Sequence, residues 1–210
     1  GVQTCALPIY EVFDPIAYDK TASVLRMLEA YTGPDAFRKA ISSYLKKYSY
    51  SNAAGEDFWT EVTRVTGKPV DRIMRGFVEQ PGAPVVTLRA SCGGDTTAIG
   101  VAQARFTGTP GATAPSQTWT LTACFKPLPD GPASCQIIDK REQKVTLKGC
   151  AANVFANPGS RGYYFSDYSP DSVRALARIA RTALTPAERL GLLGDRSEEH
   201  TSELQSRFGI

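Results

Sequence analysis

The stretch Val78–Leu88, VEQPGAPVVTL, decides the fold because the hydrophobic pattern of the chain changes within it. Before it, apolar residues recur at helical spacing, whereas the residues after it are β-branched or alternate between apolar and polar. Pro81, Gly82 and Pro84 interrupt both patterns and are typical of a connection between elements. The sequence therefore predicts an α+β chain, in which a helical part ends at residue 83 and a β-rich part begins at residue 84.

Residues 10–83 predict short antiparallel helices. The expected ranges are 17–33, 34–50, 56–67 and 68–82, and each carries an apolar stripe at helical spacing. Glycines at positions 33 and 67 are expected to end two of them. The stripes include Val24, Leu28, Tyr31, Phe37, Ile41, Tyr44, Phe58, Trp59, Val62, Val70, Ile73 and Phe77.

Residues 84–168 predict an antiparallel β-sandwich, because short strand-like runs follow one another with Gly, Pro and Asn between them. In the run QTWTLTACF, residues 117–125, strict alternation predicts an inward face of Trp119, Leu121, Ala123 and Phe125. The stretch 108–117, GTPGATAPSQ, is too rich in Gly and Pro for a strand and predicts an exposed loop. The other expected strands are residues 84–91, 142–149, 152–157 and 162–168.

Residues 169–195 return to the helical pattern. Ser169 is expected to cap one helix, with Pro170 in its first turn, and Thr185 is expected to cap the next. This segment predicts the start of a further helical domain.

The two ends of the chain, residues 1–9 and 196–210, stand apart from this pattern. With one choice of codons, the reverse complement of the DNA for GVQTCALPI encodes SEEHTSEL, which is Ser197–Leu204. The DNA sequences that encode two unrelated peptide ends are not expected to be reverse complements of each other. Both ends resemble translated read-through of a sequencing adapter. We therefore expect both ends to be artefacts, which removes Cys5 and the one histidine, His200, from any site. On this interpretation residues 10–195 are an internal fragment of a longer protein.

Cysteines within residues 10–195 lie in the β-rich part. Cys124 and Cys135 flank the turn-forming stretch KPLPDGPAS and are placed to face each other across a hairpin, which leaves Cys92 and Cys150 for each other. Buried free thiols explain the sequence equally well, and four cysteines allow three pairings. Disulfide bonds would favour an oxidising compartment, either periplasmic or secreted.

Charge and hydropathy narrow the possible partners. The formal net charge is +3, and the basic stretches RVTGKPVDR and YLKKY carry few charges, which lie beside aromatic or apolar residues of the stripes. This balance argues against a nucleic-acid interface. No apolar run approaches the roughly 20 residues that a helix needs to cross a bilayer, so no membrane span is expected here.

The order of these pieces resembles the zinc-dependent aminopeptidases related to aminopeptidase N. The resemblance rests on Tyr-x-Lys at Tyr18–Lys20, Val-Leu-x-Met-Leu at Val24–Leu28 and Phe-Arg at Phe37–Arg38, followed by QPGAPVV, GYY and LTPAERLGLLGD. Thr21 departs from the pattern, because family members often have glycine there. The resemblance implies the helical end of a thermolysin-like catalytic domain at residues 10–83, a β-sandwich at 84–168 and the start of a helical carboxyl-terminal domain at 169–195.

The resemblance also implies a zinc peptidase that removes amino-terminal residues from peptides. In that family a His-Glu-x-x-His helix and a later glutamate hold the zinc. Residues 10–195 contain no histidine, so the zinc ligands are expected in another part of the parent protein and the fragment is expected to be inactive alone. One catalytic residue carries over, Tyr18, whose phenol keeps its proton at neutral pH and can donate a hydrogen bond to the scissile carbonyl oxygen as that oxygen becomes negative.

Other interpretations of these residues remain open. Tyr18 alone would equally be a tyrosine that packs at a helix start, and Lys20 is expected to be a solvated helix residue. The whole chain would also fit a non-catalytic module that binds protein or carbohydrate, because a sandwich does not determine function. A pseudo-enzyme that keeps Tyr18 but lacks the zinc ligands is a further alternative, and the upstream sequence of the gene would distinguish these possibilities.

Overall fold

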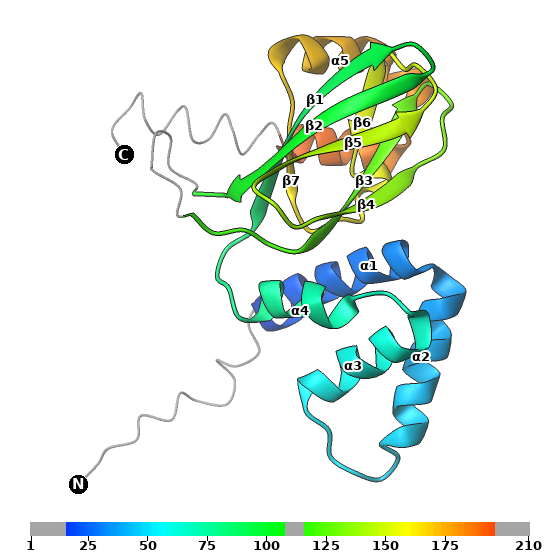
Figure 1. Ribbon diagram of the computed structural model, residues 1–210, viewed down its shortest axis with the longest axis vertical. Coiled ribbons are helices and arrows are strands. Elements are labelled where there is room, and N and C mark those ends of the chain that lie inside the picture. Colours follow the sequence, from blue (N-terminus) through cyan, green and yellow to red (C-terminus); the bar gives the residue numbers. More distant parts are fainter. Residues whose placement is uncertain (1–15, 108–115, 196–210) are drawn as a thin grey trace, which may run out of the picture.

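The computed structural model describes residues 16–107 and 116–195. The predicted artefacts at residues 1–9 and 196–210, His200 among them, and most of the predicted loop at 108–117 lie outside the described residues. Within the described parts, helices occupy the first segment, strands the second and helices the third, so the expected α+β class is confirmed (Figure 1).

The helical part begins with a wide π-helical turn, η2 (Ile16–Lys20), which leads directly into α1 (Thr21–Thr32). Gly33 ends α1 with φ of 91°, and Gly67 ends the third helix with φ of 66°, both in a region that a side chain disfavours. The predicted helices are confirmed to within a few residues. The remaining three are α2 (Pro34–Lys47), α3 (Gly55–Thr66) and α4 (Val70–Val78).

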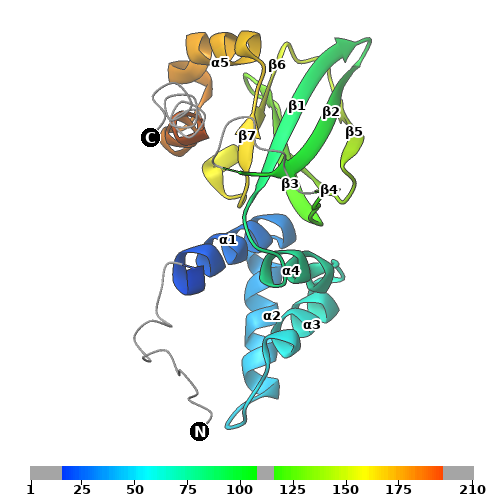
Figure 2. The same cartoon turned by 90° about the vertical axis from the view of Figure 1, so that its left-hand side faces the viewer.

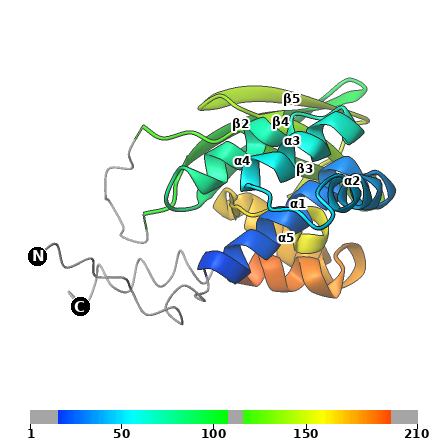
Figure 3. The same cartoon turned by 90° about the horizontal axis from the view of Figure 1, so that it is seen from below.

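These helices pack by their predicted apolar stripes. Val24, Met27 and Leu28 of α1 are buried together with Ile73 and Phe77 of α4. α1 and α4 form the layer next to the strands, while α2 and α3 lie on the far side of that layer (Figures 1 and 2). Viewed from below, α1 and α4 both run across the underside of the sheets (Figure 3).

The β-rich part is a sandwich of two sheets. One has the order β5-β2-β1-β7 and the other the order β4-β3-β6. The strands are β1 (Pro84–Gly93), β2 (Thr96–Arg105), β3 (Leu121–Leu128), β4 (Ser134–Ile138), β5 (Glu142–Lys148), β6 (Asn153–Ala156) and β7 (Phe165–Asp167). β2 and β4 were not predicted. β2 could not be recognised from its sequence because small residues at alternate positions, such as Ala98 and Gly100, have low strand propensity.

The expectation of a purely antiparallel sandwich is wrong for one pair of strands. β7 lies parallel to β1, with Val85 opposite Phe165 and Thr87 opposite Asp167. The chain changes sheets between β6 and β7, passing through the short 3₁₀ turn η3 (Pro158–Ser160). No hairpin joins β7 to its neighbour, so no tight turn imposes the antiparallel direction.

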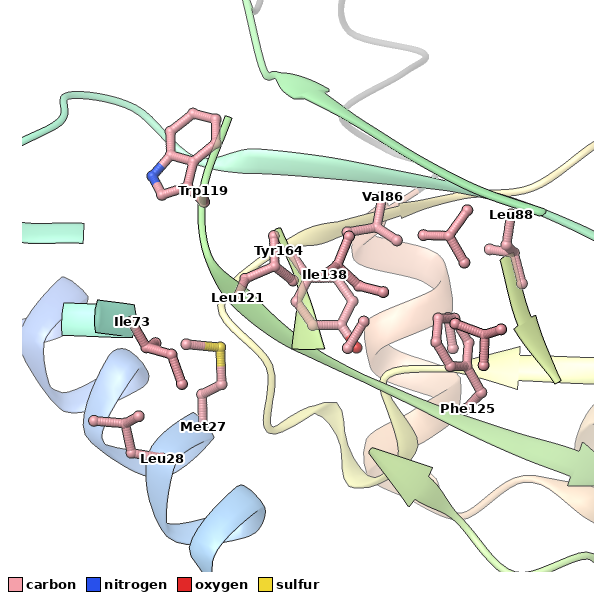
Figure 4. Packing of buried hydrophobic residues seen from close by; sticks show 14 of the residues in the cluster. Met27, Leu28, Ile73, Val86, Leu88, Trp119, Leu121, Phe125, Ile138 and Tyr164 are labelled. Atoms are coloured by element: carbon pink, nitrogen blue, oxygen red, sulfur yellow. The ribbon is translucent and has the colours of Figure 1, made fainter. Parts of the chain in front are cut away.

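The two sheets enclose a core that continues into the helices. Trp119, Leu121, Ala123 and Phe125 are all buried, as their alternation predicted. Figure 4 shows Val86 and Leu88 of one sheet approaching Leu121, Phe125 and Ile138 of the other, with Met27 and Ile73 of the helices beyond them. The hydrophobic cluster is therefore shared between the helical part and the sandwich.

Both predicted disulfide bonds are present. Cys124 and Cys135 are register partners on the adjacent strands β3 and β4 and are bonded to each other. Cys92, at the end of β1, is bonded to Cys150, which follows β5. The alternative of buried free thiols is therefore wrong.

The last part begins with α5 (Pro170–Ala183), and residues 186–195 are helical as well. Ser169 Oγ accepts a hydrogen bond from the Ser172 N–H at 3.2 Å, which confirms the predicted cap. At the next helix the Glu188 N–H donates to Thr185 Oγ1 and the Thr185 N–H donates to the Glu188 carboxylate, a reciprocal capping box. None of the described helices has the length and apolar character needed to span a membrane.

Candidate functional site

Tyr18 lies on the η2 turn, just before α1, with 56% of its surface exposed. The buried residues of α1 begin at Val24, so Tyr18 lies apart from the stripe that packs into the core. A residue that contacts a substrate must be accessible, and Tyr18 meets this condition.

A pocket of about 370 Å³ opens beside this turn. Its walls come from α1, α3 and α4, and they are mainly apolar, with Lys20 and Thr21 adding polar atoms. The lining residues are Lys20, Thr21, Val24, Trp59, Met74, Phe77 and Val78. A mainly apolar pocket of this kind is suited to hold part of an organic ligand. Tyr18 is not among its lining residues and lies two positions before Lys20.

Lys20 differs from its predicted role as a solvated helix residue. It is half-buried at the wall of this pocket, and burial lowers the pKa of its ammonium group. The direction follows from the loss of solvent around the charged form. Lys20 therefore belongs to the surroundings of Tyr18.

A buried carboxylate links α2 to α3, the helix that carries Trp59. Glu61 of α3 is 1% exposed and accepts hydrogen bonds from Ser43 Oγ at 2.6 Å and from Arg64 Nε at 3.1 Å. Lys47 Nζ lies 3.4 Å from the same carboxylate. These bonds lower the pKa of Glu61 to about 2, well below its ordinary value, with the bond from Arg64 contributing most and the bond from Ser43 next. These contacts hold α2 against the helix that supplies Trp59 to the pocket.

The sandwich contacts α4 through two segments. Trp119 packs against Gly76 of α4, where an added Cβ would lie 3.4 Å from Trp119 Cδ1. Asp139, between β4 and β5, forms an ion pair with Arg72 of α4, and the distance from its carboxylate oxygen to the guanidinium nitrogen is 2.8 Å. The helix that forms one wall of the pocket is therefore attached to the sandwich at two points.

The residues present do not fit a zinc site. Within the described residues, no group of three or more His, Cys, Asp or Glu side chains is arranged to hold a metal. The cysteines at positions 92, 124, 135 and 150 are in disulfide bonds and offer no thiolate. A zinc centre would need ligands from other parts of a longer protein.

Sequence reasoning missed the buried polar residues of the molecule. Gln103 and Glu61 are 2% and 1% exposed. The sequence patterns around them predict a strand or a helix, but they do not predict which groups these side chains bind. For Glu61 a weak signal existed, because Arg64 stands three positions later on the same helix. Gln103 had no such signal, since its partners are 16 and 37 residues away.

Comparison with known proteins shows which proteins the chain resembles. Residues 5–77 match the Peptidase family M1 domain. Over 192 residues, 89% of the chain, the sequence is 31% identical to a protein named puromycin-sensitive aminopeptidase from Caenorhabditis elegans, of which the match covers 20%. It is 34% identical over 191 residues to tricorn protease-interacting factor F2 from Thermoplasma acidophilum, of which the match covers 22%.

A shorter stretch is more similar still. Over 84 residues, 40% of the chain, it is 48% identical to aminopeptidase M1-C from Oryza sativa subsp. japonica. The chain thus spans about a fifth of the length of the first two relatives. The matched segment at residues 5–77 contains Tyr18, six of the seven residues that line the pocket, and most of the helical part. The predicted resemblance is confirmed: residues 5–77 match the Peptidase family M1 domain, and the relatives named above are aminopeptidases and a tricorn protease-interacting factor.

Proposed function

We propose that this chain is part of a zinc metallo-aminopeptidase, a hydrolase that removes amino-terminal residues from peptides. Support comes from the family M1 match at residues 5–77 and from relatives whose names include puromycin-sensitive aminopeptidase and aminopeptidase M1-C. In this proposal residues 10–83 are the helical end of a thermolysin-like catalytic domain. Residues 84–168 form the β-sandwich domain, and residues 169–195 start a helical carboxyl-terminal domain.

The observation that carries the proposal is the position of Tyr18. Its exposed side chain stands on the turn before α1, inside the segment that matches the family. We assign Tyr18 as the catalytic residue in this chain: its hydroxyl donates a hydrogen bond to the scissile carbonyl oxygen as that oxygen gains negative charge. A fixed donor aimed at developing charge stabilises the transition state more than the bound substrate.

The zinc ligands belong to other parts of the parent protein in this proposal, because the described residues contain no suitable group. Zinc in such a site supplies Lewis-acid chemistry when it is bound. The isolated chain is accordingly inactive. An upstream reading frame without a His-Glu-x-x-His motif would instead support a pseudo-enzyme or a module that binds protein or carbohydrate.

The two disulfide bonds support a proposal about the compartment. Bonds such as Cys92–Cys150 persist in oxidising surroundings and are rare where thiols are kept reduced. We propose that the parent protein functions in the periplasm or is secreted. Fractionation of the source cells, followed by immunoblotting for the chain, would contradict this if the protein is found with the reduced cytosolic proteins.

The Tyr18→Phe substitution in the complete enzyme tests the assignment. We expect kcat on an aminoacyl p-nitroanilide to fall by about a hundredfold to a thousandfold, the usual effect of removing one such donor, while KM changes little. Tyr50→Phe is the matched control, because Tyr50 is fully exposed beyond the end of α2. A rise in KM with unchanged kcat would show that Tyr18 binds substrate without acting in the transition state.

A further inference from the structure

We propose that Gln103, a buried residue of the sandwich, is a positioning residue for Tyr18. It holds the two sandwich segments that contact α4, and α4 in turn packs on the helix that continues from the Tyr18 turn. This inference rests on the proposed catalytic role of Tyr18. It adds a function for the sandwich, which would otherwise be a separate domain beside the reaction site.

The Gln103 side chain uses its whole carboxamide group in the protein interior. Nε2 donates to the Trp119 carbonyl at 2.9 Å and to the Lys140 carbonyl at 3.1 Å, and Oε1 accepts from the Trp119 N–H at 2.8 Å. The Gln103 backbone N–H also donates to the Arg141 carbonyl at 2.8 Å. One residue of β2 therefore fixes two separate pieces of chain, before β3 and before β5.

Those two pieces are the ones that reach α4. Trp119 is 1% exposed and packs against Gly76. Asp139, the residue before Lys140, pairs with Arg72 one turn away on the same helix. A third contact strengthens the first, because Gln80 Nε2, just beyond the end of α4, donates to the carbonyl of Thr118 at 3.2 Å.

The route continues from α4 to the Tyr18 turn through packed side chains. Ile73 and Phe77 of α4 are buried in the same cluster as Val24 and Met27 of α1. Figure 4 shows Ile73 and Met27 close together on the helices, with Trp119 and Leu121 of the sandwich above them. Tyr18 stands on η2, and η2 joins α1 without a break at Lys20, so a shift of α1 would move the hydroxyl.

Loss of the carboxamide should act mainly at this interface. Gln103→Leu replaces the carboxamide with a shorter apolar side chain, so the buried Trp119 N–H and the carbonyls of Trp119 and Lys140 lose the bonds that Gln103 made to them. The segments before β3 and before β5 would then be less firmly fixed, and their contacts with α4 would weaken. Small displacements of a catalytic donor lower turnover steeply, and we expect a tenfold to hundredfold loss of kcat with KM changed less than about threefold.

A double-mutant cycle in the complete enzyme tests the coupling. Gln103→Leu is combined with Tyr18→Phe, and kcat is measured for both single variants and the pair. If Gln103 acts through Tyr18, the leucine substitution loses most of its effect on kcat once Tyr18 is phenylalanine. Additive losses would overturn the inference, because they would mean that Gln103 affects the enzyme by another route.

Thr97→Val is the matched control. Thr97 is fully buried and lies on the same strand as Gln103, at the other end of β2. Its Oγ1 donates a hydrogen bond to the Gly149 carbonyl and accepts one from the Ala151 N–H. It should lower stability while leaving kcat within about twofold of the wild type. An equal loss of kcat in Thr97→Val and Gln103→Leu would reduce the effect to general destabilisation and overturn the inference.

A second variant keeps the test decisive if Gln103→Leu does not fold. Asp139→Asn removes a partly exposed charge that pairs with Arg72, and it should be tolerated. We expect a smaller loss of kcat, about twofold to fivefold, that disappears in the Tyr18→Phe background, and a loss that persists there would contradict the proposed route.

The two proposals fail in distinguishable ways. If Tyr18→Phe leaves kcat unchanged, both the catalytic assignment of Tyr18 and this inference are wrong. If Tyr18→Phe lowers kcat strongly but the losses from the sandwich variants are additive with it, only this inference is wrong.

Discussion

At the scale of single residues, the polar groups of the interior show how the helical part is held together. The Glu61 carboxylate is inaccessible, but the side chains of Arg64 and Lys47 that contact it are mostly exposed. Its charge therefore stays compensated by groups that remain in contact with water. A carboxylate in this setting stabilises the fold only while it is ionised.

The first prediction concerns the pH dependence of that contribution. The pKa of Glu61 is lowered from 4.5 to about 2 in the folded protein, so its stabilisation is present above about pH 4.5 and is lost as the pH falls towards 2. The difference in Tm between wild type and Glu61→Gln should therefore shrink steadily over this window. Thermal unfolding followed by circular dichroism measures it.

Glu142→Gln on the exposed edge of β5 is the control for this measurement. Its curve of Tm against pH should follow that of the wild type. A gap between wild type and Glu61→Gln that stays constant from about pH 5 to about pH 2 would contradict the ionised role of Glu61.

Residues whose surroundings follow from local pattern could be predicted from the sequence. The inward face of Trp119 and Phe125 followed from alternation, and the Cys124–Cys135 bond followed from the turn between the two residues. Gln103 and Glu61 could not be predicted, because a polar residue in a strand or helix is ordinarily exposed. Their partners come together only when separate elements pack. The same holds for Lys20, whose burial depends on neighbouring helices.

At the scale of elements, helix ends illustrate where sequence signals act directly. Ser169 has extended backbone geometry and its hydroxyl accepts from the Ser172 N–H, so it satisfies one of the free donors at the start of α5. Signals of this kind involve residues two or three positions apart. They were therefore visible without knowledge of the fold.

The second prediction is the cost of losing this cap. Ser169→Ala should lower the free energy of unfolding by about 1 kcal/mol, the usual value for a serine cap. Urea denaturation monitored by circular dichroism provides the measurement. Ser42→Ala, at an exposed position inside α2, should be neutral or slightly stabilising, since alanine is the better helix former. Equal losses in both variants would exclude a specific capping effect.

Strands were harder to predict than helices for a physical reason. The outward residues of β2 include Ala98, Gly100 and Ala102, whose small side chains give little β propensity. The strand forms because its inward residues fill the core and because both of its edges are paired, to β1 and to β5. Neither condition can be recognised within the strand itself.

At the scale of the whole molecule, the two disulfide bonds constrain the chain over different distances. Cys92–Cys150 joins residues 58 positions apart and spans β2 to β5, whereas Cys124–Cys135 closes a hairpin of 11 positions. A cross-link that closes a longer loop removes more freedom from the unfolded chain. The longer bridge should therefore contribute more to stability.

The third prediction follows from these loop lengths. Replacing both Cys92 and Cys150 by serine should lower the free energy of unfolding by ~4 kcal/mol, and replacing both Cys124 and Cys135 should lower it by ~3 kcal/mol. Guanidinium denaturation of the two double variants, with and without a reductant, gives the comparison. The reductant should have its larger effect on the variant that retains Cys92–Cys150. A reversed order of losses would show that native packing around the bridges outweighs loop entropy.

The parallel alignment of β1 and β7 has a consequence for the path of the chain through the sandwich. Parallel neighbours share one direction, so the chain enters the sandwich at the end nearest α4 and leaves it at the opposite end, where α5 begins (Figures 1 and 2). An antiparallel last strand would have returned the polypeptide to its point of entry. The body of the sandwich thus lies between α4 and the start of α5 (Figures 1 and 2).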